Sequence, residues 1–216
     1  MKQEEFFDEQ IIDMINQAQQ KTTASASNAS KNVKQVEKEV QAEAEKSIFD
    51  TGVKILGKWI SFERRLLAKE TITMMLPKDF VPMPPEIARM KYPSEHRPET
   101  ILTEETGSVN LMLQYMDGEV DNNTIEIFRN QVFGMMKRVN SGIKEREMGA
   151  ADVAGVRIAY VEFSNNAMDG KLYNLMFYLP VKGKPLMGSF NCMTKDMKYW
   201  KTIAFEMMQS IELIEA

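Results

Sequence analysis

The chain has 216 residues, of which 44% are hydrophobic and 27% are charged, and its formal net charge is −4 at pH 7. This length suits one domain with an appendage, and the composition is that of an ordinary globular protein. The negative net charge and the lack of a basic stripe disfavour nucleic acid as a partner. Because the chain has one cysteine and one histidine, an intrachain disulfide, a thiolate zinc cluster and any metal motif built on a histidine pair are excluded.

Residues 1–58 are predicted to form an N-terminal helical arm. Apolar residues recur at helical spacing in 1–20 and along a thin stripe in 31–46. The small polar segment between them, 21–30, is predicted to be a flexible linker. The next segment, SIFDTGVKILGKWISF (47–62), is interpreted as a connecting helix docked on the core, with a membrane-surface helix as the alternative.

The start of the chain, MKQEEFFDEQIIDMINQ, lacks the basic region and the continuous apolar region of a signal peptide. The sequence also has no run of about 18 apolar residues that could cross a bilayer. We therefore expect a cytoplasmic protein without a transmembrane segment.

The compact domain is predicted to span residues 59–216, with strands and helices in a characteristic order. Extended structure begins near Trp59, and short apolar runs between turn residues predict further strands in 71–77, 99–105, 106–118, 143–155, 155–164, 171–181 and 186–194. The turn between the strands in 155–164 and 171–181 is placed at Asp169-Gly170. Helices are predicted in 84–92, 121–142 and 196–214.

The two long helices carry apolar stripes that should cover the sheet. In 121–142 an Asn123/Glu126 capping box is predicted, and the stripe consists of Ile125, Phe128, Val132, Met135, Met136 and Val139. In the last helix the stripe consists of Met197, Trp200, Ala204, Met207 and Ile211. Consecutive strands joined by tight turns imply an antiparallel sheet. The predicted fold class is therefore α+β, with the antiparallel β-sheet sandwiched between α-helices in α/β/α layers.

The sequence contains no recognisable catalytic motif. Neither a glycine-rich phosphate loop nor a G-x-S-x-G elbow is present. Cys192 alternates in phase with Leu186 and Phe190, which indicates a buried and unreactive thiol. His96 lies between Pro93 and Pro98, so a structural corner is favoured over a catalytic one. We predict no catalytic residues, no metal and no cofactor.

Five residues are candidates for binding. The corner MKYPSEHRPE offers Tyr92, His96 and Arg97 to a ligand or partner. Methionine is common, with 18 residues, and Met112 and Met116 share one face of the strand in 106–118. Methionines can line an adaptable apolar groove, but they can equally fill a core. Both interpretations stay open at this point.

Residues 59–216 resemble the PsbP-like superfamily. The resemblance rests on the "LPxxF" entry strand in TITMMLPKDF, on MKYPSEHRPETILTEETGSVNLML, on GVRIAYVEFSNN…KLYNLMFYLPVKGKPLMGSFNC and on YWKTIAFEMMQSIELI, in that order. The superfamily includes the extrinsic photosystem II protein, a Ran-binding nuclear import factor, DcrB-type proteins and the effector-associated chaperones of type VI secretion. The resemblance implies a central antiparallel sheet between helices, and roles in binding or assembly. Residues 1–58 lie outside it.

The resulting hypothesis is a cytosolic, non-catalytic protein-binding or adaptor module. The first alternative is a secretion chaperone that holds a hydrophobic segment of an effector, and the second is an enzyme of unknown class. A protein partner is expected, whereas its identity and the oligomeric state are left open by the sequence.

Overall fold

The computed structural model describes residues 47–50, 52–93, 97–167 and 170–214. By its contacts the chain divides into two units, Met1–Glu45 and Lys46–Ala216, and the described residues belong to the second. The predicted helices in 1–20 and 31–46, the linker and His96 lie outside the described residues.

The second unit has the predicted mixture of strands and helices. Its strands are β1 (Val53–Ile55), β2 (Lys58–Ile60), β3 (Phe62–Leu67), β4 (Ile72–Pro77), β5 (Val81–Pro82), β6 (Thr100–Thr103), β7 (Asn110–Tyr115), β8 (Lys144–Val153), β9 (Val156–Ala167), β10 (Gly170–Val181), β11 (Lys184–Met193) and β12 (Glu212–Leu213). Its helices are α2 (Pro85–Lys91), α3 (Ile125–Val139), the 3-10 turn η1 (Thr194–Asp196) and α4 (Met197–Gln209).

A seven-stranded antiparallel sheet forms the centre of this unit, with strand order β5-β6-β7-β11-β10-β9-β8. Two turns in which both central residues have positive φ, Ala154-Gly155 and Lys182-Gly183, join β8 to β9 and β10 to β11. Such turns match the twist of the strands they connect. A three-stranded sheet, β12-β4-β3, and the β1-β2 hairpin complete the strands.

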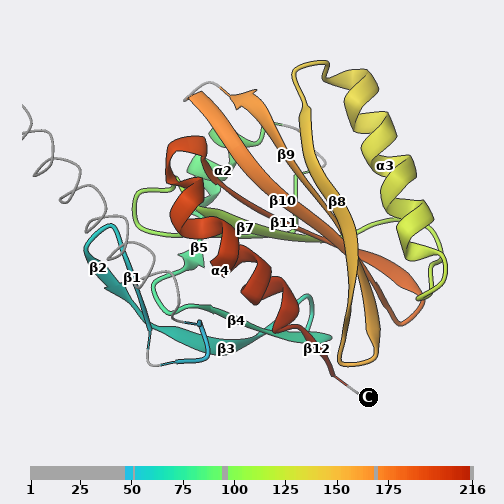
Figure 1. Ribbon diagram of the computed structural model, residues 1–216, viewed down its shortest axis with the longest axis horizontal. Coiled ribbons are helices and arrows are strands. Elements are labelled where there is room, and N and C mark those ends of the chain that lie inside the picture. The colour runs from blue at the N-terminus through green and yellow to red at the C-terminus, as the bar shows by residue number, and fades with distance from the viewer. Residues whose placement is uncertain (1–46, 51, 94–96, 168–169, 215–216) are drawn as a thin grey trace, which may run out of the picture. The chain divides into compact units, whose positions relative to one another are not determined.

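The two faces of the large sheet are covered differently. One face packs against α4, the small sheet and the hairpin in the main apolar cluster, which includes Phe177, Phe190 and Trp200. The other face packs against α3 through a second cluster around Phe133 and Phe163. The layered α+β architecture predicted from the sequence is thus confirmed (Figure 1).

The predicted helix in 47–62 is wrong, because residues 53–60 form the β1-β2 hairpin. Leu56 and Gly57 both have positive φ at the turn, and Val53 and Ile60 pair across the strands with both side chains buried. The division into an arm of residues 1–58 and a domain of residues 59–216 stays a prediction. It assigns Val53 and Ile55 to the arm, although both side chains pack in the main cluster.

The predicted packing face of α3 also needs correction. Met135 and Val139 of the predicted stripe are 55% and 90% exposed. Arg129, which is not part of that stripe, is buried. The Arg129 guanidinium donates hydrogen bonds to the backbone carbonyls of Gly149 and Tyr160, and so attaches α3 to β8 and β9. A buried arginine is tolerated here because its donors find carbonyl acceptors.

The predicted capping box at the start of α3 is wrong as well. The Asp121 carboxylate, three residues before the helix cap Thr124, accepts hydrogen bonds from the backbone N–H of Asn123 and of Thr124, both at 2.9 Å. Glu126 instead pairs with Arg157 on β9, at 2.8 Å.

The last helix is shorter than predicted. α4 ends at Gln209, and the chain then forms β12, which pairs with β4. The Ser210 hydroxyl accepts a hydrogen bond from the backbone N–H of Met75, at 2.8 Å, and this bond ties the end of α4 to the small sheet. Trp200, Ala204, Met207 and Ile211 of the predicted stripe are buried.

Two adjacent residues test whether the segment before the hairpin is part of the domain. Ile48 is fully buried in the main cluster, and its N–H donates to the Glu206 carboxylate, at 2.9 Å. Phe49 is 59% exposed. We expect Ile48→Ala to lower the free energy of unfolding by about 2–4 kcal/mol and Phe49→Ala to change it by less than about 0.5 kcal/mol. Urea denaturation followed by circular dichroism measures both values, and equal losses would contradict the packing described.

Candidate functional site

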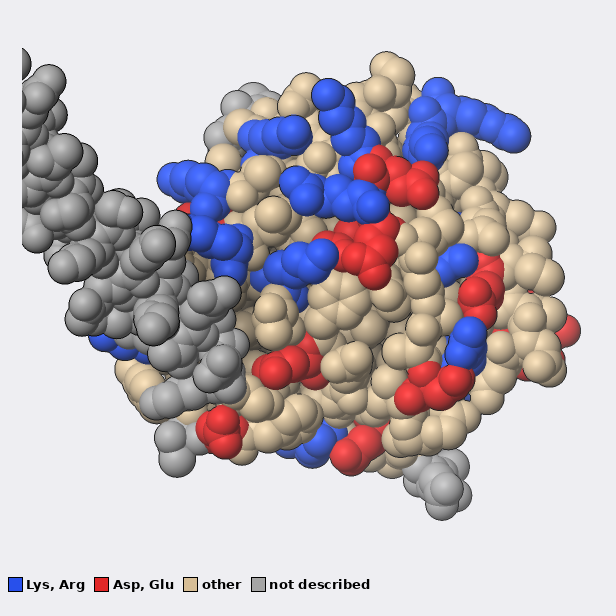
Figure 2. Space-filling view, in the orientation of Figure 1, with Lys and Arg blue, Asp and Glu red and all other residues tan. Residues whose placement is uncertain are grey.

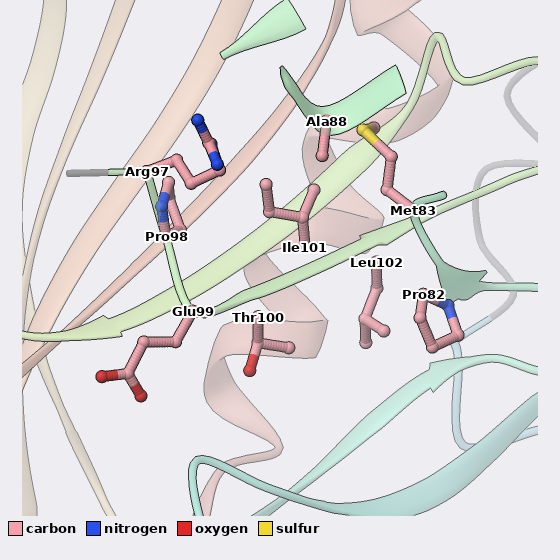
Figure 3. Close-up of a pocket in the computed structure, with 9 residues that line it drawn as sticks. All are labelled: Pro82, Met83, Ala88, Arg97, Pro98, Glu99, Thr100, Ile101 and Leu102. Atoms are coloured by element: carbon pink, nitrogen blue, oxygen red, sulfur yellow. The ribbon is translucent and has the colours of Figure 1, made fainter. Parts of the chain in front are cut away.

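A pocket of about 380 Å³ opens at the β5 edge of the large sheet. It is lined by Pro82, Met83, Ala88, Arg97, Pro98, Glu99, Thr100, Ile101 and Leu102 (Figure 3). These residues come from β5, the connection after it, α2, β6 and the segment that leads into β6. Arg97 is the candidate binding residue that the pocket includes.

The pocket lies where pairing between β5 and β6 stops. β5 pairs Val81 with Thr103 and Pro82 with Leu102, and one more bond runs from the Met83 N–H to the Ile101 carbonyl, at 2.8 Å. The next two residues of the chain are Pro84 and Pro85, which have no N–H to donate. At Thr100, the first residue of β6, β7 lies on one side, and in the described part of the chain no strand lies on the other.

Side chains on both sides of β6 contribute to the pocket. Figure 3 shows Ile101 on the side of Ala88 and Met83, while Leu102 and Thr100 point to the opposite side. This alternation is that of a strand. The pocket therefore lies at the backbone edge of β6 and is lined by side chains from both faces of the sheet. Ile101, Leu102, Met83 and Ala88 are each less than 10% exposed, and they give the pocket an apolar floor.

Charged groups stand at one end of the pocket. Glu99 pairs with Lys69, at 2.9 Å. The Arg97 Nε donates to the backbone carbonyl of Tyr92, at 3.2 Å, and no ion pair involves this guanidinium among the described residues. The positive charge of Arg97 is therefore available to an acidic group beside the apolar floor.

Tyr92 lies next to this corner, at the C-terminal end of α2. Burial raises the pKa of its hydroxyl, and a hydrogen bond from the Asn191 side chain opposes that rise. Tyr92 also packs against the small apolar cluster under α2. The structure thus brings two candidate residues, Tyr92 and Arg97, into one corner.

The two candidate methionines belong to different clusters. Met112 is 8% exposed and packs beneath α2 with Met83, Ala88 and Ile101. Met116 is partly buried and packs against the cluster under α3. They share a face of the sheet, as predicted, but the structure does not bring them together in one open trough.

A row of buried polar side chains crosses the same face of the sheet, two residues along the strands from Met112. Cross-strand pairing aligns Thr103, Asn110, Asn191 and Asn174 on four neighbouring strands, and all four are buried. The Asn110 side-chain amide donates to the Asn191 Oδ1, at 3.0 Å. This row could not be predicted from the sequence, because its members are far apart in the sequence and only the strand register aligns them.

The buried ionisable groups elsewhere contact one another. The Glu162 carboxylate accepts hydrogen bonds from the Tyr173 hydroxyl, at 2.7 Å, and from Lys201 Nζ, at 2.8 Å. Burial raises the pKa of the Cys192 thiol to about 12, which leaves almost no thiolate at neutral pH. The buried position predicted for Cys192 is confirmed.

The chain is similar to known proteins in fold and not in sequence. No family model matches the chain, and no curated protein matches it by sequence. The solution structure of cyanobacterial PsbP (CyanoP) from Synechocystis sp. PCC 6803 is similar, with 12% identity and a TM-score of 0.53 over 79% of this chain and 99% of that chain. The PsbP-like fold predicted from the sequence is thereby confirmed.

Two further solved structures are similar at lower scores. LpqN of Mycobacterium tuberculosis, described as involved in cell envelope biogenesis, has 12% identity and a TM-score of 0.48 over 72% of this chain and 92% of that chain. PA94 of Pseudomonas aeruginosa, described as a putative regulator of unknown function, has 8% identity and a TM-score of 0.41 over 72% of this chain and 99% of that chain. At such identities the likeness concerns the fold alone. Within the described residues, no helix is long and apolar enough to cross a membrane.

Matched charge substitutions test the packing under α2. Met112 on β7 is 8% exposed beneath α2, whereas Met90 on α2 itself is 71% exposed. We expect Met112→Glu to lower the free energy of unfolding by about 3 kcal/mol or more, because an unpaired carboxylate would be buried. We expect Met90→Glu to change it by less than about 0.5 kcal/mol. Thermal unfolding of both variants measures the difference, and an unchanged Met112→Glu protein would mean that this face is open.

Proposed function

We propose that the protein is a non-catalytic binding module that takes an extended segment of a partner protein at the open edge of β6. The observation that supports this most strongly is the end of β5 pairing after two residues, next to a pocket of about 380 Å³. Unpaired strand edges are templates for an added strand, with backbone hydrogen bonds giving affinity and adjacent pockets giving specificity.

The lining of the pocket suggests the chemistry of the segment. An apolar side chain of the partner would fill the floor formed by Ile101, Met83 and Ala88. An acidic group would meet Arg97, which has no carboxylate partner among the described residues. A mainly apolar lining with a few placed polar groups is typical of ligand pockets, in which the polar groups provide specificity.

Exposed apolar side chains next to the pocket favour a second candidate function. Val81, Ile87 and Met90 are 50%, 40% and 71% exposed on β5 and α2. An extended apolar surface beside the strand edge would suit a secretion chaperone that holds a hydrophobic segment of its client. This second function uses the same edge of β6 as the first. It differs in that a longer apolar stretch of the bound protein is held. The cytoplasmic location predicted from the sequence belongs to the proposal in either form, and the predicted adaptor role belongs to the first.

Site-specific cross-linking tests the proposed edge. A photoreactive amino acid at the exposed Val81 of the full chain is expected to cross-link to one segment of one partner in the native cell, which mass spectrometry identifies. The same amino acid at Thr202, an exposed position on α4, is the control and should not cross-link to that segment.

A peptide copied from the segment then gives the quantitative test. We expect Thr100→Trp, which places a large ring at the edge of β6 among the residues that line the pocket, to weaken peptide binding at least about tenfold by calorimetry, while Thr202→Trp leaves it unchanged. Thermal unfolding of both variants checks that the fold is retained. Equal binding by both variants would overturn the proposed site. A bound segment of mainly apolar residues would select the chaperone form over the adaptor form.

A further inference from the structure

Basic side chains gather at one end of the large sheet, around the start of α4. Figure 2 shows lysine and arginine side chains crowded over the upper part of the face that α4 crosses. We call this set the basic patch; it consists of Lys144, Arg146, Lys171, Lys195, Lys198 and Lys201.

Strand register explains why these residues meet. Lys144 pairs with Ser164, Ser164 with Tyr173, and Tyr173 with Cys192, so the ends of four neighbouring strands lie side by side. Lys171 is two residues before Tyr173 and therefore shares its face of the sheet. The chain leaves β11 after Met193 and enters η1 and α4 directly, which places Lys195 and Lys198 at the same end.

Most of the charge in the basic patch is not neutralised. Lys201 binds Glu162 and Glu147, at 2.8 and 3.8 Å. Each of the other five basic residues is exposed, and among the described residues none of the five has a carboxylate within ion-pair distance. The local charge is thus positive although the whole chain has a net charge of −4. Such a local field attracts an anionic partner.

An exposed apolar residue lies at this end as well. Val139, the last residue of α3, is 90% exposed next to the exposed Arg138. Lys137 in the same turn pairs with Glu145 on β8, at 3.0 Å, so the end of α3 is attached beside the start of β8. An apolar tip flanked by cations is the combination that binds the interface of an anionic bilayer.

We infer that the basic patch, with Val139 at its border, docks this protein on an anionic lipid surface. Lysines dominate the patch, and they act as mobile point charges that suit a fluid layer of headgroups. A single-stranded nucleic-acid surface would need exposed aromatic rings for base stacking, and Tyr199, the ring under Lys198, is only partly exposed. This inference is independent of the peptide site proposed above, because the two sites share no residue.

Vesicle sedimentation tests the inference with two variants of equal net charge. Lys195→Glu/Lys198→Glu reverses two charges in the basic patch, and Lys182→Glu/Lys184→Glu reverses two exposed charges at the β10-β11 turn, at the other end of these strands. Full-length proteins are mixed with vesicles of phosphatidylcholine that contain either no phosphatidylglycerol or about 30 mol % of it.

We expect the wild-type protein and the turn variant to bind the anionic vesicles and not the neutral ones. The patch variant should bind at least about 25-fold more weakly, since each lost basic residue is worth about fivefold at such a surface. Salt at about 0.5 M should release the bound proteins, because charge interactions are then screened over a few ångströms. Val139→Ser should weaken binding a few-fold without changing its salt dependence.

Three results would overturn the inference: no binding to anionic vesicles, equal binding to neutral and anionic vesicles, or equal losses in the two double variants. A gel shift with duplex DNA provides the competing outcome. Binding of DNA that the patch variant loses, in a protein that does not bind vesicles, would make this end a nucleic-acid surface instead. Circular dichroism melting confirms that each variant is folded.

Discussion

The close approach of Phe177 to Gly188 fixes how the central strands fit together. The two residues are paired between β10 and β11, and the Phe177 ring occupies the space that a side chain at position 188 would need. The ring is fully buried in the main cluster and has no room to move aside. Because Gly188 also pairs with Leu113 on β7, this position joins the half of the sheet that carries α3 to the half that carries α2. A slip of one residue would turn every buried side chain of β11 to the wrong face.

The open edge of β6 follows from the sequence that comes after β5. Pro84 and Pro85 follow the last hydrogen bond of that strand. Pro85 is the first residue of α2, where its fixed φ is favourable and its missing N–H costs nothing. The same two prolines therefore end the strand and begin the helix. The helix then covers Met112 and leaves the start of β6 accessible. Pro84 and Pro85 are thus responsible both for the pocket and for the start of the helix.

Much of the fold could be predicted because its signals are local. Strands β9, β10 and β11 are apolar runs separated by residues typical of short turns, and the buried stripe of α4 has clear helical spacing. The β1-β2 hairpin was missed because Leu56-Gly57 does not resemble a common turn pair, and its apolar residues also fit helical spacing. The role of Arg129 could not be predicted, since a charged residue on a helix normally faces water. Its carbonyl partners on β8 and β9 become visible only in the folded structure.

The candidate site was predictable only in part. Its corner could be identified, because Tyr92 and Arg97 flank a short segment bordered by prolines. The floor of the pocket could not, because it depends on the pairing of Pro82 with Leu102, and no sequence pattern links these residues. The polar row from Thr103 to Asn174 has the same origin in strand register.

Core and surface residues of this protein are subject to different physical constraints. The side chains that fill the main cluster must keep their volume and their alternation, since cores tolerate little change in packing. The basic patch and the rim of the pocket contribute little to that packing, so their residues can change without loss of the fold. This separation accounts for a shared fold with CyanoP at 12% identity. It also means that the binding properties of this chain must be derived from its own edge strand and its own charges, because the fold alone does not determine them.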